Sequence, residues 1–413
     1  MTAFARREGV LECDGVALDA LAAEHGTPLY VYSAAALVCG YEAYARAFAP
    51  IPHRICYALK ANSCGALLRL LAARGAGADI VSGGELRAAL RAGFPPERIV
   101  FSGVGKTDAE MRLGLEKGIG EWNAESEAEI ERLSQAASAA GRSARLTLRV
   151  NPDIDPRSHP YISTGLHQNK FGVEIGRGVE ILERARRQPA VTVTGVQCHI
   201  GSQVLDLGAL EEAAHALAAM SRELMRRGFA LETVDVGGGL GVDYERDGGP
   251  PPADLAARLL PAFASLGLRL LLEPGRSIVA RAGALLTRVL HVKDGARKRF
   301  VIVDAGMNDL LRPALYEAFH RIEPVRERVA ATTSTVDVVG PVCETGDFLA
   351  RDRALPEVQV GELLAVRDAG AYGFSMSSNY NLRPRAAEVL VEDGRPRLVR
   401  RREDFEDLVR TEV

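Results

Sequence analysis

Residues 55–80 read ICYALKANSCGALLRLLAARGAGADI and contain one unit of the pattern that decides the fold. A short apolar run at 55–59 is followed by a segment, 65–75, whose apolar residues recur at helical spacing, and a second apolar run begins at Ala78. Short apolar runs that alternate with helical segments predict βα units, which place their strands side by side in a parallel sheet.

The same pattern extends from about residue 29 to residue 273. The predicted strands are 55–59, 78–81, 99–102, 120–123, 145–150, 193–200, 233–236 and 269–273. Eight is the number of parallel strands that closes a (β/α)8 barrel, in which functional residues lie at the carboxyl ends of the strands. We therefore predict an α/β fold in which residues 29–275 form such a barrel.

Beyond Glu273 the pattern changes to strand-like runs without intervening helices, namely 278–292, 300–304, 334–339 and 363–367. We expect residues 276–413 to form a second, mainly β domain, and the weakly strand-like residues 1–28 to join it. A chain of 413 residues is long enough for two domains that each have a core.

The composition is ordinary for a soluble globular protein and argues against several classes of function. A net charge of −3 gives no reason to expect a nucleic-acid partner. The six cysteines form no C-x-x-C pair and no cluster with histidine, so we expect neither a disulfide framework nor a metal site. No apolar run approaches the roughly 18 residues of a membrane span, and no leader is evident, so we expect a cytoplasmic protein without membrane contact.

Polar residues stand where the predicted strands end, and in a barrel these ends converge on one mouth. Lys60 directly follows the run 55–59, and burial at such a position can lower the pKa of a lysine and make it a Schiff-base nucleophile. The other five lysines lie among turn glycines or charges and are more typical of solvated side chains. Taken alone, Lys60 also fits a solvated lysine better, so the hypothesis depends on its neighbours.

Strand eight ends in Glu273-Pro274-Gly275-Arg276, which places a carboxylate and a guanidinium on one turn. A pyridoxal phosphate (PLP) site needs a carboxylate at the pyridine nitrogen, because the protonated ring is the electron sink. Backbone N–H groups of Gly237-Gly238-Gly239-Leu240-Gly241 can bind a phosphate, and the loops after strands seven and eight are the usual phosphate site of barrels. A glycine run by itself is more often a plain turn.

Two nucleotide-binding motifs fail on their spacing. The stretch 103–107, GVGKT, resembles the end of a P-loop, but Val100 occupies the position of the first required glycine. In the glycine run at 237–241, Val242 stands where a dinucleotide-binding fingerprint has its third glycine.

Seven segments together resemble the fold-type III PLP-dependent decarboxylases, and specifically the diaminopimelate decarboxylase family. In the barrel they are YALKAN at 57–62, CHIGSQ at 198–203, GGGLG at 237–241 and EPGR at 273–276. In the β domain they are MNDLLRPALY at 307–316, GPVCETGD at 340–347 and GAYG at 370–373. The resemblance covers nearly the whole chain.

The resemblance implies a role for each matching residue. Lys60 would form the Schiff base with PLP, His199 would stack on the pyridine face and Glu273 would pair with the ring nitrogen. Cys343 would protonate the carbon from which CO2 departs, and it would act with its neighbour Glu344 across the interface of a symmetric homodimer. The other cofactor-binding residues would be Asp79, Ser202, Gly238, Gly239, Gly275, Arg276 and Tyr372.

The implied substrate is meso-2,6-diaminopimelate, which would yield L-lysine and CO2 in the last step of bacterial lysine biosynthesis. Its remote end carries a carboxylate and an ammonium group, and arginine suits two-point binding of a carboxylate. Decarboxylases of ornithine or lysine have no such carboxylate to bind, so the matching arginines favour diaminopimelate. The candidate substrate-binding residues are Arg276, Arg312, Tyr316, Glu344 and Tyr372.

Three alternatives remain. A decarboxylase of the same fold could act on ornithine, arginine or carboxynorspermidine. An amino-acid racemase of the same fold would keep the lysine but would generally carry an arginine in place of Glu273. A non-catalytic PLP-binding protein would be a single short barrel, and a solvent-exposed, unperturbed Cys343 would favour it.

Overall fold

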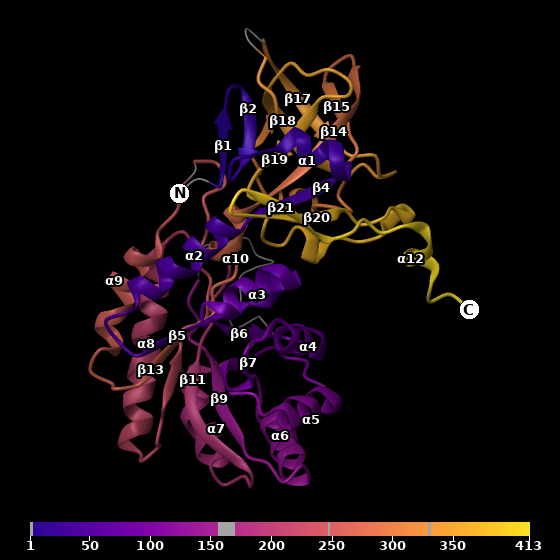
Figure 1. Cartoon of the computed structure of the whole chain (residues 1–413). Helices are drawn as coiled ribbons and strands as arrows, with labels where there is room; N and C mark the ends of the chain where they lie inside the picture. The colour runs from indigo at the N-terminus through magenta and orange to yellow at the C-terminus, as the bar shows by residue number, and fades with distance from the viewer. Residues whose placement is uncertain (1–2, 156–169, 247, 329–331) are drawn as a thin grey trace. The chain divides into compact units, whose positions relative to one another are not determined.

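The computed structural model describes residues 3–155, 170–246, 248–328 and 332–413. It divides the chain into two compact units (Figure 1). The barrel unit comprises Tyr41–Val242 and Gly249–Ser277. The β unit comprises Met1–Gly40, Asp243–Gly248 and Ile278–Val413.

Eight parallel strands form the closed barrel, and this confirms the predicted fold class. Every neighbouring pair is parallel, and the pairings of β13 with β5 and of β8 with β9 complete the circle. A short strand, β10 (Val173–Glu174), adds to the edge of β9. The eight strands are β5 (His53–Ala58), β6 (Gly77–Ile80), β7 (Ile99–Phe101), β8 (Glu121–Ala124), β9 (Ala144–Asn151), β11 (Val191–Gln197), β12 (Thr233–Asp235) and β13 (Arg269–Leu272).

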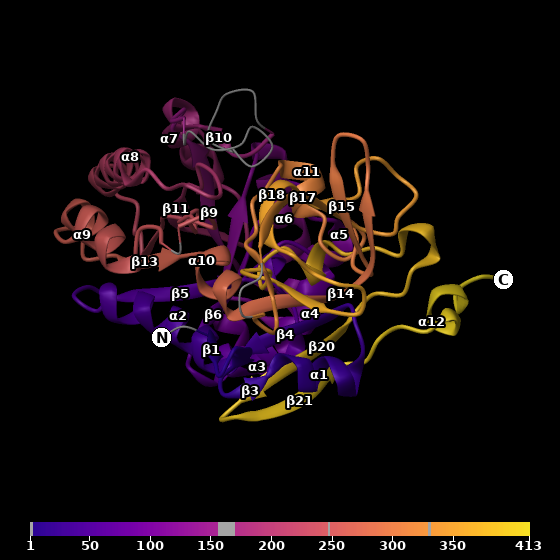
Figure 2. The same cartoon turned by 90° about the horizontal axis from the view of Figure 1, so that it is seen from above.

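Helices follow the strands along the chain and lie outside them (Figure 2). Their ends have clear local causes. The side chains of Ser82 and Thr107 accept hydrogen bonds from backbone N–H groups in the first turns of α4 and α5, and left-handed Gly93 and Gly118 end these helices. Helix α2 (Ala34–Ala47) precedes β5. The helices that follow the strands are α3 (Gly65–Ala73), α4 (Gly83–Ala92), α5 (Asp108–Lys117), α6 (Glu127–Ala139), α7 (Ile175–Ala185), α8 (Leu207–Arg226) and α9 (Pro252–Phe263).

The β unit is built on a mixed sheet with the order β18-β17-β15-β14-β4-β20-β21. Strand β19 also pairs with β14, and β16 pairs with β19. Its strands are β4 (Leu29–Ser33), β14 (Gly283–Asp294), β15 (Arg299–Val303), β16 (Ile322–Pro324), β17 (Thr333–Val339), β18 (Phe348–Pro356), β19 (Leu363–Val366), β20 (Ala387–Glu392) and β21 (Arg395–Arg400).

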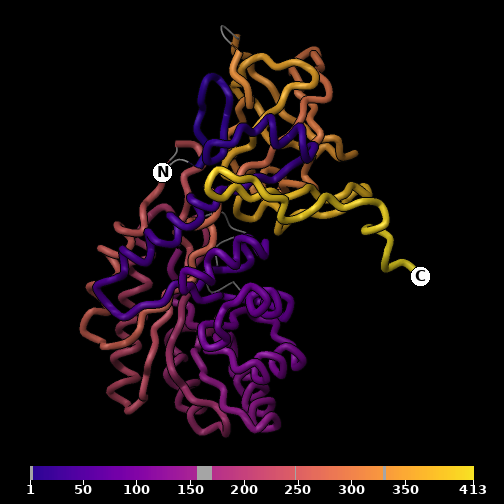
Figure 3. Tube along the Cα trace, in the orientation of Figure 1, coloured from indigo at the N-terminus to yellow at the C-terminus, as the bar shows by residue number. Residues whose placement is uncertain are grey.

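Residues from both ends of the chain share this sheet. Strand β4 is antiparallel to β14 and parallel to β20, which lies far away in sequence but beside it in space (Figure 3). All five residues of β4 are buried. The residues before it form a small antiparallel sheet, β1 (Phe4–Arg7), β2 (Val10–Cys13) and β3 (Val16–Ala17), and a helix, α1 (Leu18–His25). Residues 29–33 therefore belong to the β unit, whereas the sequence-based boundary places them in the barrel.

One predicted strand begins too early. Residues 278–282 are expected to be extended, but they form the end of α10 (Arg276–Val279) and the 3-10 turn η4 (Ala280–Ala282). Ile278 and Val279 are buried in these turns. A short apolar run indicates burial, but it does not distinguish a strand from a helical turn. No helix within the described ranges has the length and hydrophobicity needed to span a bilayer.

Candidate active site

Lys60 lies at the mouth of the barrel, in the turn η1 (Leu59–Ala61) that directly follows β5. Its Nζ lies 3.0 Å from Oδ2 of Asp79, a fully buried carboxylate on β6. The lysine side chain itself is 38% exposed, so its nitrogen is accessible to a small molecule. Asp79 Oδ1 is buried and has no hydrogen-bond partner among the described residues, which leaves a buried acceptor beside the lysine.

Glu273 is a buried carboxyl group at the end of β13 that accepts hydrogen bonds from three side chains. Asn123 Nδ2 and Ser102 Oγ lie 3.1 and 3.3 Å from Oε1, and Gln197 Nε2 lies 3.1 Å from Oε2. Burial, followed by the neighbouring carboxyl groups of Asp235 and Asp79, raises the pKa of Glu273 well above its ordinary value. The group therefore has a high affinity for a proton.

Asp235 on β12 extends this carboxyl cluster. Its side chain hydrogen-bonds to Glu273, and its Oδ1 accepts the backbone N–H of Gly237 at 2.8 Å. Burial raises the pKa of Asp235 to about 6. Two buried carboxyl groups in contact share a proton, and a cationic N–H placed beside Glu273 would let both groups ionise.

His199 follows β11 and carries a neutral ring. The backbone N–H of Gly238 donates to its Nδ1 at 3.1 Å, so this nitrogen is an acceptor. Burial, together with the positive charges of Arg149 and Lys60, lowers the pKa of His199 well below its ordinary value. A neutral imidazole can stack on a flat ring without adding charge to the site.

The loops after β11 and β12 are joined to each other by backbone hydrogen bonds. Val204 N–H donates to Gly239 O at 2.9 Å, and Gly241 N–H donates to Val204 O at 2.8 Å. The side-chain amide of Gln203 bonds to both the N–H and the carbonyl of Val242, at 3.2 and 2.5 Å. These bonds fix the backbone of the glycine run.

Arg276, at the start of α10, reaches the same loops. Its Nη2 lies 3.1 Å from the hydroxyl of Ser202. A Cβ atom at Gly238 would lie 2.2 Å from Glu273 O, and one at Gly239, where φ is +106°, would lie 2.4 Å from Gly201 O. Both positions therefore require glycine, and the result is a cradle of bare backbone, hydroxyl and guanidinium groups suited to a phosphate.

These features fit PLP. The cofactor needs an amine, which Lys60 supplies, and a carboxylate beside its protonated ring nitrogen, a place that the buried carboxyl group of Glu273 can fill. Lys106 does not compete for the first role. Its buried Nζ donates to Glu129 Oε1 at 2.7 Å and to two backbone carbonyl groups, at Gly103 and Asn123, which engages its three protons.

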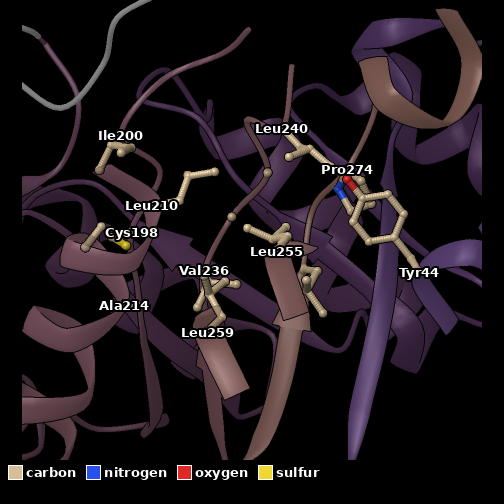
Figure 4. Close-up of a pocket in the computed structure, with 14 residues that line it drawn as sticks. Tyr44, Cys198, Ile200, Leu210, Ala214, Val236, Leu240, Leu255, Leu259 and Pro274 are labelled. Carbon is tan, nitrogen blue, oxygen red and sulfur yellow. The ribbon is translucent and has the colours of Figure 1, made fainter. Parts of the chain in front are cut away.

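An apolar cavity lies behind the glycine run, against α8 and α9 (Figure 4). Its lining includes Cys198, Val236, Leu255 and Leu259. The volume open to the centre of a water molecule is about 10 Å3, about the minimum that one water needs. It is a packing defect of the barrel wall and has no room for a substrate.

The remaining candidate residues lie in the β unit. Arg312 begins the short helix α11 (Arg312–Tyr316), and Tyr316, four residues later, lies on the same helix face. Arg312 is buried, and its Nη1 lies 2.6 Å from Nε2 of His320. Tyr372 has a left-handed backbone, with a φ of +56°, which a tyrosine rarely adopts.

Cys343 and Glu344 are exposed on the loop that joins β17 to β18. Asp347 holds this loop, because its carboxylate accepts the N–H groups of Val342 and Met307, each at 2.6 Å. Exposure of Cys343 in the single chain, taken alone, fits the alternative of a non-catalytic PLP-binding protein.

The model of the pyridoxal binding domain of pyridoxal-dependent decarboxylases matches residues 35–280. Diaminopimelate decarboxylase of Aquifex aeolicus is 49% identical over 98% of this chain and 96% of its own length. The enzyme of the same name from Pseudomonas aeruginosa is 50% identical over 99% of this chain and 98% of its own length. The chain belongs to the diaminopimelate decarboxylase family.

Solved structures lead to the same family. Diaminopimelate decarboxylase of Helicobacter pylori complexed with L-lysine has a TM-score of 0.92 and 45% identity, covering 96% of this chain and 99% of that one. The enzyme from M. jannaschii in complex with L-lysine has a TM-score of 0.95 and 38% identity, covering 100% and 98%. A lysine/ornithine decarboxylase from Vibrio vulnificus, at 23% identity and a TM-score of 0.80, shares the fold.

Membership of this family confirms three predictions, namely the fold-type III architecture, PLP as cofactor and carboxy-lyase activity. The comparisons give no support to ornithine, arginine or carboxynorspermidine as substrates. The single-barrel alternative is wrong, because the relatives match the β unit as well as the barrel.

Sequence reasoning missed several residues that surround Glu273 and the glycine run. Gln197 and Asp235 are the last residues of β11 and β12, and each bonds to Glu273. Gln203 joins two loops through its side-chain amide. A polar residue at the end of a barrel strand was the available signal for Gln197 and Asp235, because such a side chain needs a hydrogen-bond partner when it is buried.

Proposed function

We propose that this protein converts meso-2,6-diaminopimelate to L-lysine and CO2. The observation that carries the reaction class is the buried Glu273, whose proton affinity is raised and whose two oxygens are held by Asn123, Ser102 and Gln197. The substrate follows from the relatives, which carry the name of this reaction and match nearly the whole chain. A cytoplasmic location is part of this proposal, because the reaction is biosynthetic.

Bound PLP supplies an electron sink for the pair of electrons that remains when CO2 departs. In our proposal Lys60 holds the cofactor through Nζ, with Asp79 beside it. Glu273 would hold the proton on the ring nitrogen, and the neutral ring of His199 would lie against the cofactor ring. The residues that would bind its phosphate, by resemblance to the family, are Ser202, Gly239, Gly275, Arg276 and Tyr372. Gly238 contributes by fixing His199, since its N–H donates to Nδ1.

Cys343 supplies the proton that replaces CO2. A thiol can donate a proton from Sγ to carbon. Its exposure in the single chain suits a group that completes the site of a second copy. We therefore propose a two-fold homodimer in which the loop carrying Cys343 and Glu344 faces the partner's barrel.

Selectivity for the remote amino-acid end of meso-diaminopimelate requires a guanidinium that binds its carboxylate and an acidic side chain that binds its ammonium group. We assign the carboxylate to Arg312, which is buried and held in place within the β unit. Glu344 is the candidate for the ammonium, and Arg276, Tyr316 and Tyr372 complete the substrate-binding set.

Rates of CO2 release from meso-diaminopimelate, L-lysine, L-ornithine and L-arginine test the proposal. We expect turnover of meso-diaminopimelate, with one L-lysine formed per CO2, and negligible rates with the other three. Preferential turnover of ornithine or arginine would transfer the protein to the other decarboxylases of this fold.

A further inference from the structure

Arg312 is held between two side chains that no sequence motif singles out. We refer to Tyr244, Arg312 and His320 as the Arg312 clamp. The guanidinium carbon of Arg312 lies 4.4 Å from the centre of the Tyr244 ring, and its Nη1 lies 2.6 Å from His320 Nε2. Tyr244 and His320 also contact each other edge to face, with ring centres 5.1 Å apart. The clamp therefore fixes both the plane and one edge of the guanidinium.

The contacts of His320 determine its protonation. Its Nδ1 lies 2.8 Å from the carbonyl oxygen of Arg367, which can only accept, so Nδ1 carries the proton. Nε2 then accepts the hydrogen bond from Arg312. A doubly protonated ring would direct N–H against N–H at 2.6 Å, so the clamp requires a neutral His320.

His320 is itself rigidly held. It is fully buried, and its carbonyl oxygen accepts a hydrogen bond from Arg353 Nη1 at 2.7 Å. The guanidinium of Arg353 lies over the Phe319 ring, 3.7 Å from its centre. Histidine, which is a weak base and a good acceptor, is thus placed where a lysine or arginine would repel Arg312.

Tyr244 comes from a segment outside the sheet of the β unit. Arg281 Nη2 donates to the carbonyl oxygens of Asp243 and Gly248 and so holds this segment on both sides of the tyrosine. The Tyr244 side chain is buried, which keeps its ring over the guanidinium. A guanidinium that lies over an aromatic ring keeps the N–H groups in its own plane available for an anion in that plane.

We propose that His320 and Tyr244 are positioning residues that orient Arg312 for the remote carboxylate of the substrate. This inference rests on the proposed role of Arg312. Two-point binding of a carboxylate requires a fixed guanidinium plane, and the clamp fixes it from one face and one edge. His320 and Tyr244 act through Arg312 and need not touch the substrate.

Two ligands separate this role from general stability. L-lysine retains the remote carboxylate, whereas cadaverine is the same diamine without it. Calorimetric titration of the PLP-loaded enzyme with each ligand would compare the wild type with R312M, H320L, H320Q, Y244L and Y244F. The glutamine variant retains an acceptor near the Nε2 position, and the phenylalanine variant retains the ring.

We expect H320L and Y244L to weaken L-lysine binding by about tenfold and to leave cadaverine binding within twofold of the wild type. H320Q and Y244F should recover most of the loss. With meso-diaminopimelate, H320L should raise KM more than it lowers kcat, because the lost contact belongs to binding.

The outcomes distinguish the two proposals. If R312M weakens L-lysine selectively but H320L and Y244L do not, the clamp is overturned and the role of Arg312 stands. If R312M leaves L-lysine binding intact, both are overturned. Equal weakening of both ligands in H320L and Y244L would indicate a purely structural role and overturn the inference. If H320L fails to fold, the binding of L-lysine and cadaverine to Y244L, with Y244F as its control, tests the inference by itself.

Discussion

Asp235 and Glu273 place two carboxyl groups in contact inside the barrel, where neither is easily ionised. The free energy of unfolding therefore falls when the pH rises and these groups ionise. The same pair of carboxyl groups favours a cation beside it, namely a protonated ring nitrogen. Repulsion between the two ionised carboxylates destabilises the cofactor-free protein. A bound cation relieves this repulsion, and the relief adds to the binding free energy of the cofactor.

The pH dependence of stability tests this arrangement in cofactor-free protein. Asp235 has a pKa of about 6 when folded and near 3.9 when unfolded, so the folded chain binds more protons between these values. The free energy of unfolding of the wild type should therefore fall as the pH rises from about 4 to about 6, by on the order of 3 kcal/mol from this group. D235N should lack that fall in urea unfolding, whereas E131Q, at an exposed site on α6, should retain it. Parallel profiles for D235N and the wild type would contradict the account.

Glu273 gives a second prediction at this scale. E273Q retains the shape of the side chain but cannot hold a proton on a ring nitrogen, so kcat should fall by about 100-fold or more while the fold is kept. Steady-state kinetics and the affinity for PLP measure the effect. S102A removes one weak hydrogen bond to the same carboxylate and serves as control, with a loss of less than tenfold. A loss of less than tenfold in E273Q itself would exclude Glu273 as the partner of the ring nitrogen.

At the scale of elements, the glycine run after β12 passes so close to neighbouring backbone atoms that it has no room for side chains. Gly239 and Gly228 both have left-handed φ values, +106° and +82°, but a Cβ at Gly239 would meet Gly201 O at 2.4 Å, whereas none lies within 4 Å at Gly228. G228A should cost about 1 kcal/mol in urea unfolding, from backbone strain alone. G239A should cost more and should also weaken PLP binding at least tenfold, because the loop must move. Equal effects of the two changes on PLP binding would contradict the cradle.

The barrel strands were predictable because each is a short apolar run between helical segments, and 55–59 and 233–236 differ from β5 and β12 by one or two residues at their ends. Several β-unit strands were not. β18 contains Arg351, Asp352 and Arg353, and β21 reads RPRLVR, with nearly every residue exposed. Such strands are set by pairing with neighbours distant in sequence and have little apolar pattern of their own.

The site was predictable to the extent that its residues follow strands. Lys60 and Glu273 stand at strand ends, where the barrel rule places functional groups. His320 and Tyr244 could not be found this way, because their significance lies in a contact with Arg312 between segments remote in sequence. Their roles became visible only from distances and hydrogen-bond partners.

At the scale of the molecule, the proposed homodimer makes each active site depend on two chains. Mixing inactive K60A with inactive C343A before reassembly should then restore activity, since half of the dimers would be hybrids and each hybrid would have one intact site. Statistical mixing predicts about a quarter of the wild-type rate. Sedimentation would verify that dimers form. Dimers that show no recovery would place Lys60 and Cys343 of the same chain in one site.

The most direct test of the whole account is to reduce the PLP-loaded protein with borohydride, digest it and identify the modified peptide by mass. We expect a single pyridoxyl-modified lysine, Lys60, because its Nζ is accessible beside Asp79 whereas the protons of Lys106 are engaged. Modification of another lysine in place of Lys60, or no modification of a protein saturated with PLP, would contradict it.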